Sequence, residues 1–398
     1  MPSMPRVLLL NYEFPPMGGG AGHASFQIAK TLVALGCSVD VITSSPTGQS
    51  TVEIIYGVRI FRVPSQRHGI HDCGFFGAWS YVITAQPVFR KLIKENSYDV
   101  IHYFFGLPTG LLLLCTPGAG KIPSLVSLRG SDVPGYDLLN KKLRAMHRLL
   151  YPLTRRIWNQ ADAVVANSHA LRELAQPVMS KKPIRVVTNA IEGDAFYPAA
   201  VNGHKKTALL RILTVARLIH RKGIQDLLHA MTFLKEEPVH LTIQGTGSQQ
   251  EQLEQLALDL GIYDRVTFAG FCVREQLPEV YQEADVFVMP SLSESFSMAV
   301  LEAMASGLPI VASQVGGMSE CVAHGVNGLL VRPQDPQTLA AAIRSLLHDA
   351  PLRHQMGKRS VEKAREQFSW QRVTSEYLSI YEQIIEQRNG NGVKHARQ

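Results

Sequence analysis

The chain has 398 residues, 45% of them hydrophobic and 18% charged, which is typical of a globular protein large enough for two hydrophobic cores. Its five cysteines lie far apart, with no CxxC pair and no His/Cys cluster, so neither a disulfide framework nor a zinc site is indicated and a reducing cytoplasm fits best. The apolar runs are too short for a signal peptide or a membrane span, and we expect neither.

The formal net charge of +7 is distributed unevenly. Residues 1–190 carry 20 Lys and Arg against 10 Asp and Glu, whereas residues 191–398 carry 20 against 23. The basic first half is therefore the half expected to meet an anionic partner. Its basic residues are not interleaved with aromatic ones, which argues against nucleic acid as that partner.

Short apolar runs alternate with amphipathic stretches of helix length, and this alternation predicts an α/β fold with parallel sheets covered by helices on both faces. In the first half the predicted strands are Val7–Leu10, Ser38–Thr43, Val58–Val63, Val100–Tyr103, Ser124–Leu128, Ala163–Ala166 and Ile184–Val187. The second half repeats the rhythm with Arg211–Val215, Val239–Gln244, Val266–Ala269, Val286–Met289 and Pro309–Ala312. A polar segment at 199–207 separates the halves, so we expect two similar doubly wound domains.

The first predicted strand runs into Gly18, Gly19 and Gly20 and then into a predicted helix from His23 to Leu35. Ligands of doubly wound sheets lie where strands lead into helices, and glycines let backbone N–H groups approach an anion there. His23 stands where the third glycine of GxGxxG would be, so a dinucleotide fingerprint is not supported. A flexible turn is the alternative interpretation of these glycines.

The segment 139–157 combines an apolar face with six Lys and Arg residues. Such an amphipathic helix can rest on an anionic membrane that carries a lipid acceptor. The alternative is a core-packed helix with a solvated basic face, interrupted by Pro152.

Two cations follow the first strand of the second half: Arg217 and, five residues later, Lys222 beside Gly223. A guanidinium and an ammonium suit a diphosphate leaving group, because charge grows on its oxygens as the bond breaks. Gly245 and Gly247, after the next strand, predict a further close approach of the backbone in the same region.

The carboxylates of Glu294 and Glu302 lie eight residues apart, and a helix is predicted to begin between them. Its cap is Ser295 or Ser297, and its first turn offers to a phosphate the N–H groups of Met298, Ala299 and Val300. Glu302 can accept hydrogen bonds from a pair of ligand hydroxyls, and Glu294 can face another part of the same ligand. This set suggests a sugar nucleotide, whereas two solvated glutamates beside an ordinary helix are the alternative.

These residues stand within an ordered series of motifs: Arg217 with Lys222-Gly223, the Gly245-Thr246-Gly247 turn, FAGF at 268–271, ADVFVMPS at 284–291, the Glu-x7-Glu pair and GLPIVASQVGGMSE from 307. Together they resemble the retaining glycosyltransferases of the GT-B fold, specifically glycosyltransferase family 4. The resemblance covers nearly the whole chain and is strongest from Arg211 to Pro333.

The resemblance implies an enzyme with two Rossmann-like domains and an active site in the cleft between them. Such an enzyme moves a hexose from a nucleoside-diphosphate sugar to a saccharide or lipid-linked acceptor and retains the anomeric configuration. Reactions of this kind occur in the synthesis of cell-surface polysaccharides and glycolipids. It implies that Arg217 and Lys222 bind the diphosphate, that Glu294 lies near the sugar and that Glu302 binds the ribose hydroxyls. The backbone around Gly270–Val273 would hold the base. Gly18 to Gly20 would close over the diphosphate or the acceptor.

Three features qualify this expectation. Glu294-Ser295-Phe296-Ser297 stands where the family often has Glu-Gly-Phe-Gly, so side chains replace open backbone near the sugar phosphate. Arg129 stands where many relatives have His, so no catalytic His is carried over; Arg129 and Asp132 are acceptor-side candidates, with a structural role as the alternative. The sequence has no Asp-x-Asp triplet, so we expect catalysis without a metal or another cofactor.

The expected domains are 1–198 on the acceptor side and 206–370 on the donor side, then a helix at 371–388 that returns to the first domain and a disordered tail at 389–398. We expect a cytoplasmic protein, with contact to an anionic membrane face as an option. Two other functions stay open: a nucleotide-sugar epimerase of the same architecture and a non-catalytic two-domain ligand binder. The pairing of two cations with Glu-x7-Glu suits donor transfer better than either.

Overall fold

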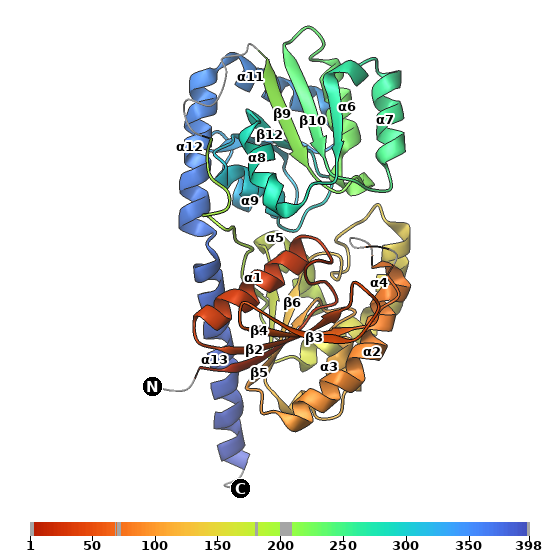
Figure 1. The fold of residues 1–398 in the computed structure, drawn as a ribbon, viewed down its shortest axis with the longest axis vertical. Coiled ribbons are helices and arrows are strands. Elements are labelled where there is room, and N and C mark those ends of the chain that lie inside the picture. Colours follow the sequence, from red (N-terminus) through yellow and green to blue (C-terminus); the bar gives the residue numbers. More distant parts are fainter. Residues whose placement is uncertain (1–3, 68, 70–72, 180–181, 200–208, 396–398) are drawn as a thin grey trace. The chain divides into compact units, whose positions relative to one another are not determined.

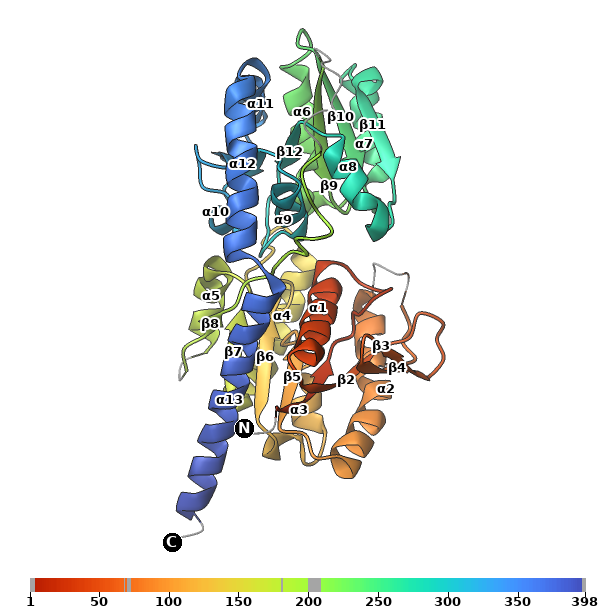
Figure 2. The same cartoon turned by 60° about the vertical axis from the view of Figure 1, so that its left-hand side comes forward.

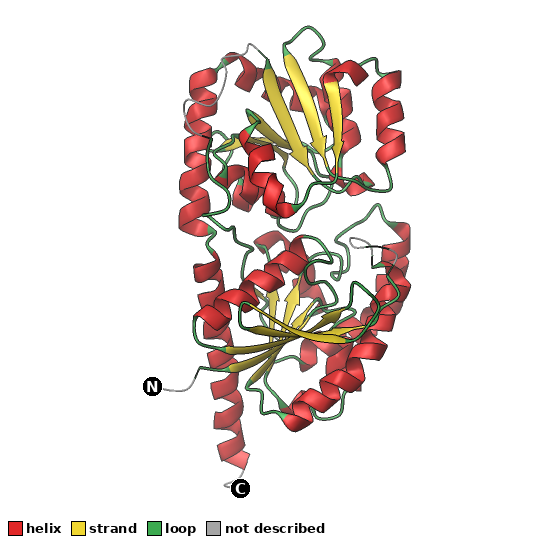
Figure 3. Ribbon diagram, viewed as in Figure 1, coloured by secondary structure: helices red, strands yellow, loops and turns green. Residues whose placement is uncertain are grey.

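The computed structural model describes residues 4–67, 69, 73–179, 182–199 and 209–395. The chain forms two compact units, one of residues 1–189 with 370–398 and the other of residues 190–369 (Figure 1). The division at 189/190 lies ahead of the polar segment 199–207 that we expected to separate the domains, most of which is outside the described residues. In each unit parallel strands alternate with helices, as predicted (Figure 3).

The first unit is built on an eight-stranded sheet of order β3-β4-β2-β1-β5-β6-β7-β8, in which only the pairing of β3 with β4 is antiparallel. Its strands are β1 (Arg6–Leu10), β2 (Ser38–Ser44), β3 (Thr51–Ile55), β4 (Val58–Val63), β5 (Val100–Phe104), β6 (Ser124–Leu128), β7 (Ala163–Ala166) and β8 (Arg185–Val186). Every residue of β5, β6 and β7 is buried, because helices cover both faces of the sheet.

The helices of the first unit include one from the far end of the chain. They are α1 (Gly20–Ala34), α2 (Gly74–Glu95), α3 (Leu111–Cys115), η1 (Ala119–Lys121), α4 (Lys141–Gln160), α5 (His169–Ala175), η2 (Gln176–Val178) and α13 (Trp370–His395). α13 packs against α1 and runs along the unit (Figure 2). The segment expected to be a disordered tail from 389 is helical as far as His395.

A buried polar network joins α13 to the middle of the sheet. His102 on β5 is fully buried; its Nδ1 lies 2.7 Å from the Tyr381 hydroxyl and its Nε2 lies 2.7 Å from Ser127 Oγ. Burial lowers the pKa of His102, so the imidazole is neutral at physiological pH and has one donor and one acceptor nitrogen. At the other end of α13, the Arg388 guanidinium holds both carboxylate oxygens of Asp162.

The second unit is built on a six-stranded parallel sheet of order β11-β10-β9-β12-β13-β14. Its strands are β9 (Leu210–Val215), β10 (Val239–Gln244), β11 (Val266–Gly270), β12 (Val286–Met289), β13 (Ile310–Ser313) and β14 (Gly328–Val331). The first strand of the unit, β9, lies between the second and the fourth, so the strand order reverses between β9 and β12. That reversal is the place where doubly wound sheets bind ligands.

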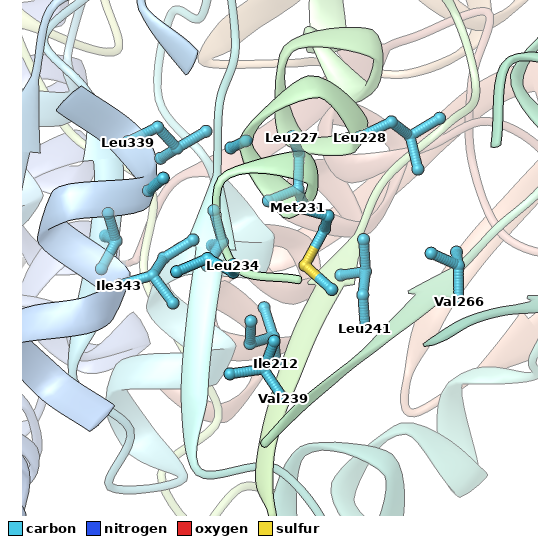
Figure 4. Packing of buried hydrophobic residues seen from close by; sticks show 14 of the residues in the cluster. Ile212, Leu227, Leu228, Met231, Leu234, Val239, Leu241, Val266, Leu339 and Ile343 are labelled. Carbon is cyan, nitrogen blue, oxygen red and sulfur yellow. The ribbon is translucent and has the colours of Figure 1, made fainter. Parts of the chain in front are cut away.

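Both faces of this sheet carry a hydrophobic core. The covering helices are η3 (His220–Lys222), α6 (Ile224–Thr232), α7 (Gln250–Asp259), η4 (Tyr263–Arg265), η5 (Arg274–Gln276), α8 (Leu277–Gln282), α9 (Met298–Ala305), α10 (Met318–Cys321), α11 (Pro336–His348) and α12 (Ala350–Gln367). On one face Leu227 and Met231 of α6 and Ile343 of α11 gather over Ile212 and Leu241 of the sheet (Figure 4). Alternate strand residues, such as Phe287 and Met289, enter the second core with α9.

The sequence analysis missed two strands, β3 and β14. β3 forms an antiparallel hairpin with β4 at the sheet edge and has exposed Val52 and Ile54, so it lacks the continuous burial of the central strands β5, β6 and β7. β14 is a four-residue edge strand that begins at Gly328, within the dipeptide Asn327-Gly328, which is more typical of a turn.

We predict that Tyr381→Phe destabilises the first unit by about 1–3 kcal/mol, because the buried His102 Nδ1 loses its only short partner in the network. Urea unfolding measures the change. Tyr56→Phe removes a hydroxyl from a side chain that is 67% exposed and is the matched control, with no expected effect. Equal midpoints for the two variants would contradict the structural role of the network.

Candidate active site

The candidate site of the second unit lies where the strand order reverses. β9 and β12 are direct neighbours, so the loops that follow them leave the sheet at the same edge. The loop after β9 carries Arg217, Arg221 and Lys222, and the loop after β12 carries Glu294. The structure thus brings together Arg217, Lys222 and Glu294, which the sequence analysis selected.

Glycine at position 223 allows these two loops to touch. Gly223 has a φ of +68°, and a Cβ there would lie 1.9 Å from the carbonyl oxygen of Pro290. Beside it, the Arg221 carbonyl accepts a hydrogen bond of 2.8 Å from the backbone N–H of Leu292. Any side chain at 223 would therefore separate the loops.

Lys222 and Glu294 form a buried ion pair across this contact. The ammonium donates to Glu294 Oε2, and the Lys222 and Glu294 side chains are only 12% and 8% exposed. Burial raises the pKa of Glu294, but Lys222 and Arg221 lower it by more, so the net shift is downward and the carboxylate is ionised. Burial and the neighbouring Arg221 and Arg217 lower the pKa of Lys222, and Glu294 opposes that shift.

The backbone of Glu294 is fixed from a third loop. Gly316 has a φ of +49°, and a Cβ there would lie 1.7 Å from the Glu294 carbonyl oxygen, which also accepts from the N–H of Gly317. This contact accounts for the first of the two glycines in the motif that follows β13.

Gly245 and Gly247 pack closely against the backbone of the preceding loop. Cβ atoms at these positions would lie 1.9 Å from the carbonyl oxygen of Ala216 and 2.3 Å from that of Leu218. The Leu218 N–H also donates to the carbonyl of Thr246 at 2.9 Å. The turn therefore supports the loop that carries Arg217, and its close approach is to the chain's own backbone.

The helix predicted between the two glutamates is α9, and Ser297 is its N-cap. The Ser297 hydroxyl accepts from the N–H of Val300 at 3.4 Å, so that N–H is used within the helix. Met298 and Ala299 begin the first turn. Glu302 lies at the fifth helical position and is 4% exposed, which excludes the alternative of a solvated glutamate.

Two partners hold the Glu302 carboxylate. Arg274 Nη1 donates to Oε1 at 2.7 Å, and the Tyr281 hydroxyl donates to Oε2 at 2.9 Å. Arg274 Nη2 also bonds Glu192 Oε2 at 3.1 Å. Burial lowers the pKa of Arg274, but Glu302 and Glu192 raise it by more. Next to Arg274, Phe271 and Val273 are 59% and 44% exposed.

The site candidates of the first unit are held by local contacts. Asp132 is buried and accepts from the N–H groups of Gly106, Arg129 and Gly130 at 2.7–3.0 Å, so the carboxylate joins the loops after β5 and β6. The Arg129 guanidinium donates to Asn189 Oδ1 at 2.9 Å and to the Tyr377 hydroxyl at 3.0 Å. For both residues the structure supplies the structural role that we had kept as the alternative.

The glycine loop after β1 divides into two parts. Gly18 has a φ of +91°, and a Cβ there would lie 2.6 Å from Glu13 Cβ, so the loop's own packing accounts for this glycine. A Cβ at Gly19 would meet nothing within 4 Å, and Gly20 is the first residue of α1. Gly19 is therefore the position whose backbone stays open.

Sequence reasoning missed Arg221, Arg274, Tyr281 and Glu192. Arg221 has a signal, because it stands between Arg217 and Lys222 in a basic run. Arg274 and Tyr281 lie on the consecutive elements η5 and α8, and Glu192 lies 82 residues before Arg274, so the three gather near Glu302 only in the folded unit. Their residue types alone give no sign of that meeting.

Among the residues that the structure describes, no group of three or more His, Cys, Asp or Glu side chains could hold a metal ion. No helix in the same residues is both long and apolar enough to cross a membrane.

We predict that Glu294→Gln lowers stability by roughly 2–3 kcal/mol at neutral pH, because Lys222 stays buried without a charged partner. The folded state lowers the Glu294 pKa, so the stabilisation is present above the ordinary value of 4.5 and is lost as the pH falls through the lowered pKa. The difference in Tm between the two proteins should therefore shrink below pH 4.5. Glu251→Gln, at an exposed position on α7, is the control; a difference in Tm that is independent of pH would contradict the pairing.

The comparisons with known proteins agree on one family. The chain matches the Glycosyl transferases group 1 profile over residues 201–363 and the Glycosyltransferase Family 4 profile over residues 18–194. It is 31% identical to a D-inositol 3-phosphate glycosyltransferase of Corynebacterium urealyticum, over 95% of this chain and 96% of that protein.

Solved structures give the same fold. Sucrose-phosphate synthase from Thermosynechococcus elongatus has a TM-score of 0.83 at 25% identity, over 96% of this chain and 99% of that chain. HepE of Anabaena, solved in complex with UDP and glucose, has a TM-score of 0.72 at 20% identity, over 94% of this chain and 99% of that chain. The chain therefore belongs to the glycosyltransferases of the GT-B fold, among the relatives of glycosyltransferase family 4.

Proposed function

We propose that this enzyme transfers a hexose from a nucleoside-diphosphate sugar to a saccharide or lipid-linked acceptor, with retention of the anomeric configuration and without a metal. The observation that carries the proposal is the buried Lys222–Glu294 pair at the reversal of the strand order, with Arg217 and Arg221 close enough to shift both pKa values. Cations and a hydroxyl-accepting carboxylate side by side suit the junction between a diphosphate and a sugar.

The diphosphate would bind to Lys222, Arg217 and the start of α9. An ammonium has three N–H donors, and the bond to Glu294 uses one of them, so two can reach phosphate oxygens. The N–H groups of Met298 and Ala299 add the positive end of the helix dipole. These groups stabilise the charge that develops as the sugar leaves the diphosphate.

Glu294 would bind the sugar and Glu302 the ribose. Because its pKa is lowered, Glu294 is an acceptor for hydroxyl groups and not a proton donor. The base would lie along the backbone of Gly270–Val273, where the exposed Phe271 and Val273 offer apolar surface. The side chains of Ser295 and Ser297, both buried, replace glycine next to the sugar phosphate and are expected to affect the choice of sugar.

In the proposed reaction the bond from the anomeric carbon to the diphosphate oxygen breaks while a bond to the acceptor oxygen forms on the same face. The acceptor proton passes to the departing diphosphate, so charge and atoms balance without a separate base. The cations of the chain take the place of a divalent ion at the diphosphate. Gly19, with its open backbone, is the candidate of the first unit for the diphosphate or the acceptor.

We predict that one of UDP, GDP and ADP raises the Tm of the protein in excess EDTA, because the cations of the chain bind the diphosphate. We also predict that Lys222→Ala lowers kcat of transfer by about 10²–10³-fold, because one of these cations is lost. Lys235→Ala, at an exposed position of the same unit, is the control. A Tm shift only with Mg²⁺ would contradict the metal-free part of the proposal. Conversion of the free nucleotide sugar to its epimer without an acceptor would favour an epimerase. Binding of the nucleotide sugar without any turnover would favour a non-catalytic ligand binder.

We further propose that α4 brings the enzyme to an anionic lipid surface on which its acceptor is carried. The helix carries six Lys and Arg side chains, and it lines a groove of about 670 Å³ whose walls include Leu138, Lys141, Arg144, Arg148 and Tyr151. Leu139 and Leu149 are 54% and 79% exposed beside these cations. Exposed leucines among basic residues are complementary to acyl chains below negatively charged headgroups.

We predict that the double variant Arg144→Glu with Arg148→Glu lowers affinity for phosphatidylglycerol vesicles about tenfold or more, because two charges are reversed at the surface. Vesicle co-sedimentation measures the affinity. Arg90→Glu with Lys91→Glu makes the same charge change on exposed positions of α2 and is the matched control. An equal loss in both variants would show that net charge, and not the α4 surface, governs binding.

A further inference from the structure

The carboxylate of Glu302 is held by two different donors, one on each oxygen. Arg274 occupies Oε1 and the Tyr281 hydroxyl occupies Oε2, at 2.7 and 2.9 Å. Tyr281 is itself fully buried and comes from α8, whereas Arg274 comes from η5. The plane of the carboxylate is therefore fixed by two elements other than the helix that carries it.

Arg274 is also held from its other side. Its second terminal nitrogen bonds Glu192 at 3.1 Å, and its guanidinium carbon lies 5.3 Å from the centre of the Phe196 ring. Both of these residues precede the sheet of the second unit in the chain. A planar guanidinium with two carboxylates in fixed directions has little freedom to turn, so Arg274 can orient Glu302.

Each carboxylate oxygen accepts two hydrogen bonds. Arg274 and Tyr281 use one lone pair of each oxygen, which leaves one lone pair on Oε1 and one on Oε2. Two acceptors on one fixed carboxylate match two hydroxyls on adjacent carbons. A single hydroxyl would leave a nearly buried, charged oxygen with one acceptor position empty, which is unfavourable.

We propose that Arg274, together with Tyr281, positions Glu302 to accept hydrogen bonds from both ribose hydroxyls, and so sets the preference of the enzyme for a ribonucleotide donor over a 2′-deoxyribonucleotide. This inference rests on the proposed ribose role of Glu302. Arg274 is a positioning residue: it acts through the carboxylate and touches no reacting atom.

The experiment is a titration calorimetry series on the full chain in EDTA. UDP, GDP and ADP and their 2′-deoxy counterparts are the probes, and the ratio of the two Kd values for the best-bound base is the quantity measured. We predict a ratio of about tenfold or more in the wild type, which falls to about two- or threefold in Arg274→Gln. Arg274→Lys, which keeps the charge but not the planar fork, should lie between them.

Arg344→Gln is the matched control, because Arg344 also bonds a glutamate of the second unit, Glu237, at 3.1 Å. Its ratio should equal that of the wild type. A merely structural role for Arg274 would weaken ribo and 2′-deoxy probes by the same factor, and that result would overturn the inference. Should Arg274→Gln fail to fold, Tyr281→Phe removes a single hydroxyl and must also lower the ratio.

Glu302→Gln separates this inference from the function on which it rests. A wild-type ratio near one, or an unchanged ratio in Glu302→Gln, would overturn the ribose role of Glu302 and the inference with it. A ratio that falls in Glu302→Gln but stays at the wild-type value in Arg274→Gln would overturn the role of Arg274 alone.

Discussion

The contact between the loops after β9 and β12 is the constraint on which the rest of the candidate site depends. Parallel strands that are neighbours in the sheet deliver their loops to one edge, and Gly223 lets the backbones touch there. Only when the two loops are in contact can the Lys222 ammonium donate a hydrogen bond to the Glu294 carboxylate while both side chains are largely buried. A buried charge pair is stable only when its geometry is good. The surrounding glycines and turns provide that geometry because they keep the two loops in place.

The two glutamates of the Glu-x7-Glu pair have different cationic partners. Glu294 lies among three cations before α9, whereas Glu302, in the second turn of that helix, is bound to one arginine that it shares with Glu192. The helix start between them contributes partial positive charge. A ligand that is anionic in the middle and rich in hydroxyls at both ends is complementary to this order, and a sugar nucleotide has that order of groups.

The sequence analysis predicted the α/β architecture, the central strands and the Ser297 cap, because each depends on a local pattern of burial or spacing. It could not predict that Arg274 meets Glu302, since the two lie 28 residues apart and the meeting depends on how η5 packs beside α9. It could not predict that the chain's own carbonyls lie against Gly245 and Gly247, because a glycine looks the same in sequence whether a ligand or the chain's own backbone lies against it. The returning helix was predicted to end at 388, but α13 continues beyond Arg388, which binds Asp162, as far as His395.

The membership of α13 in the first unit has a consequence for the order of biosynthesis. The ribosome makes residues 1–189 first, but the His102 network and the α1 surface receive their cover only when residues 370–395 emerge. The second unit, which is continuous from 190 to 369, has all its strands before that moment. A nascent chain can therefore complete the core of the second unit while the surface of the first unit that α13 covers is still exposed.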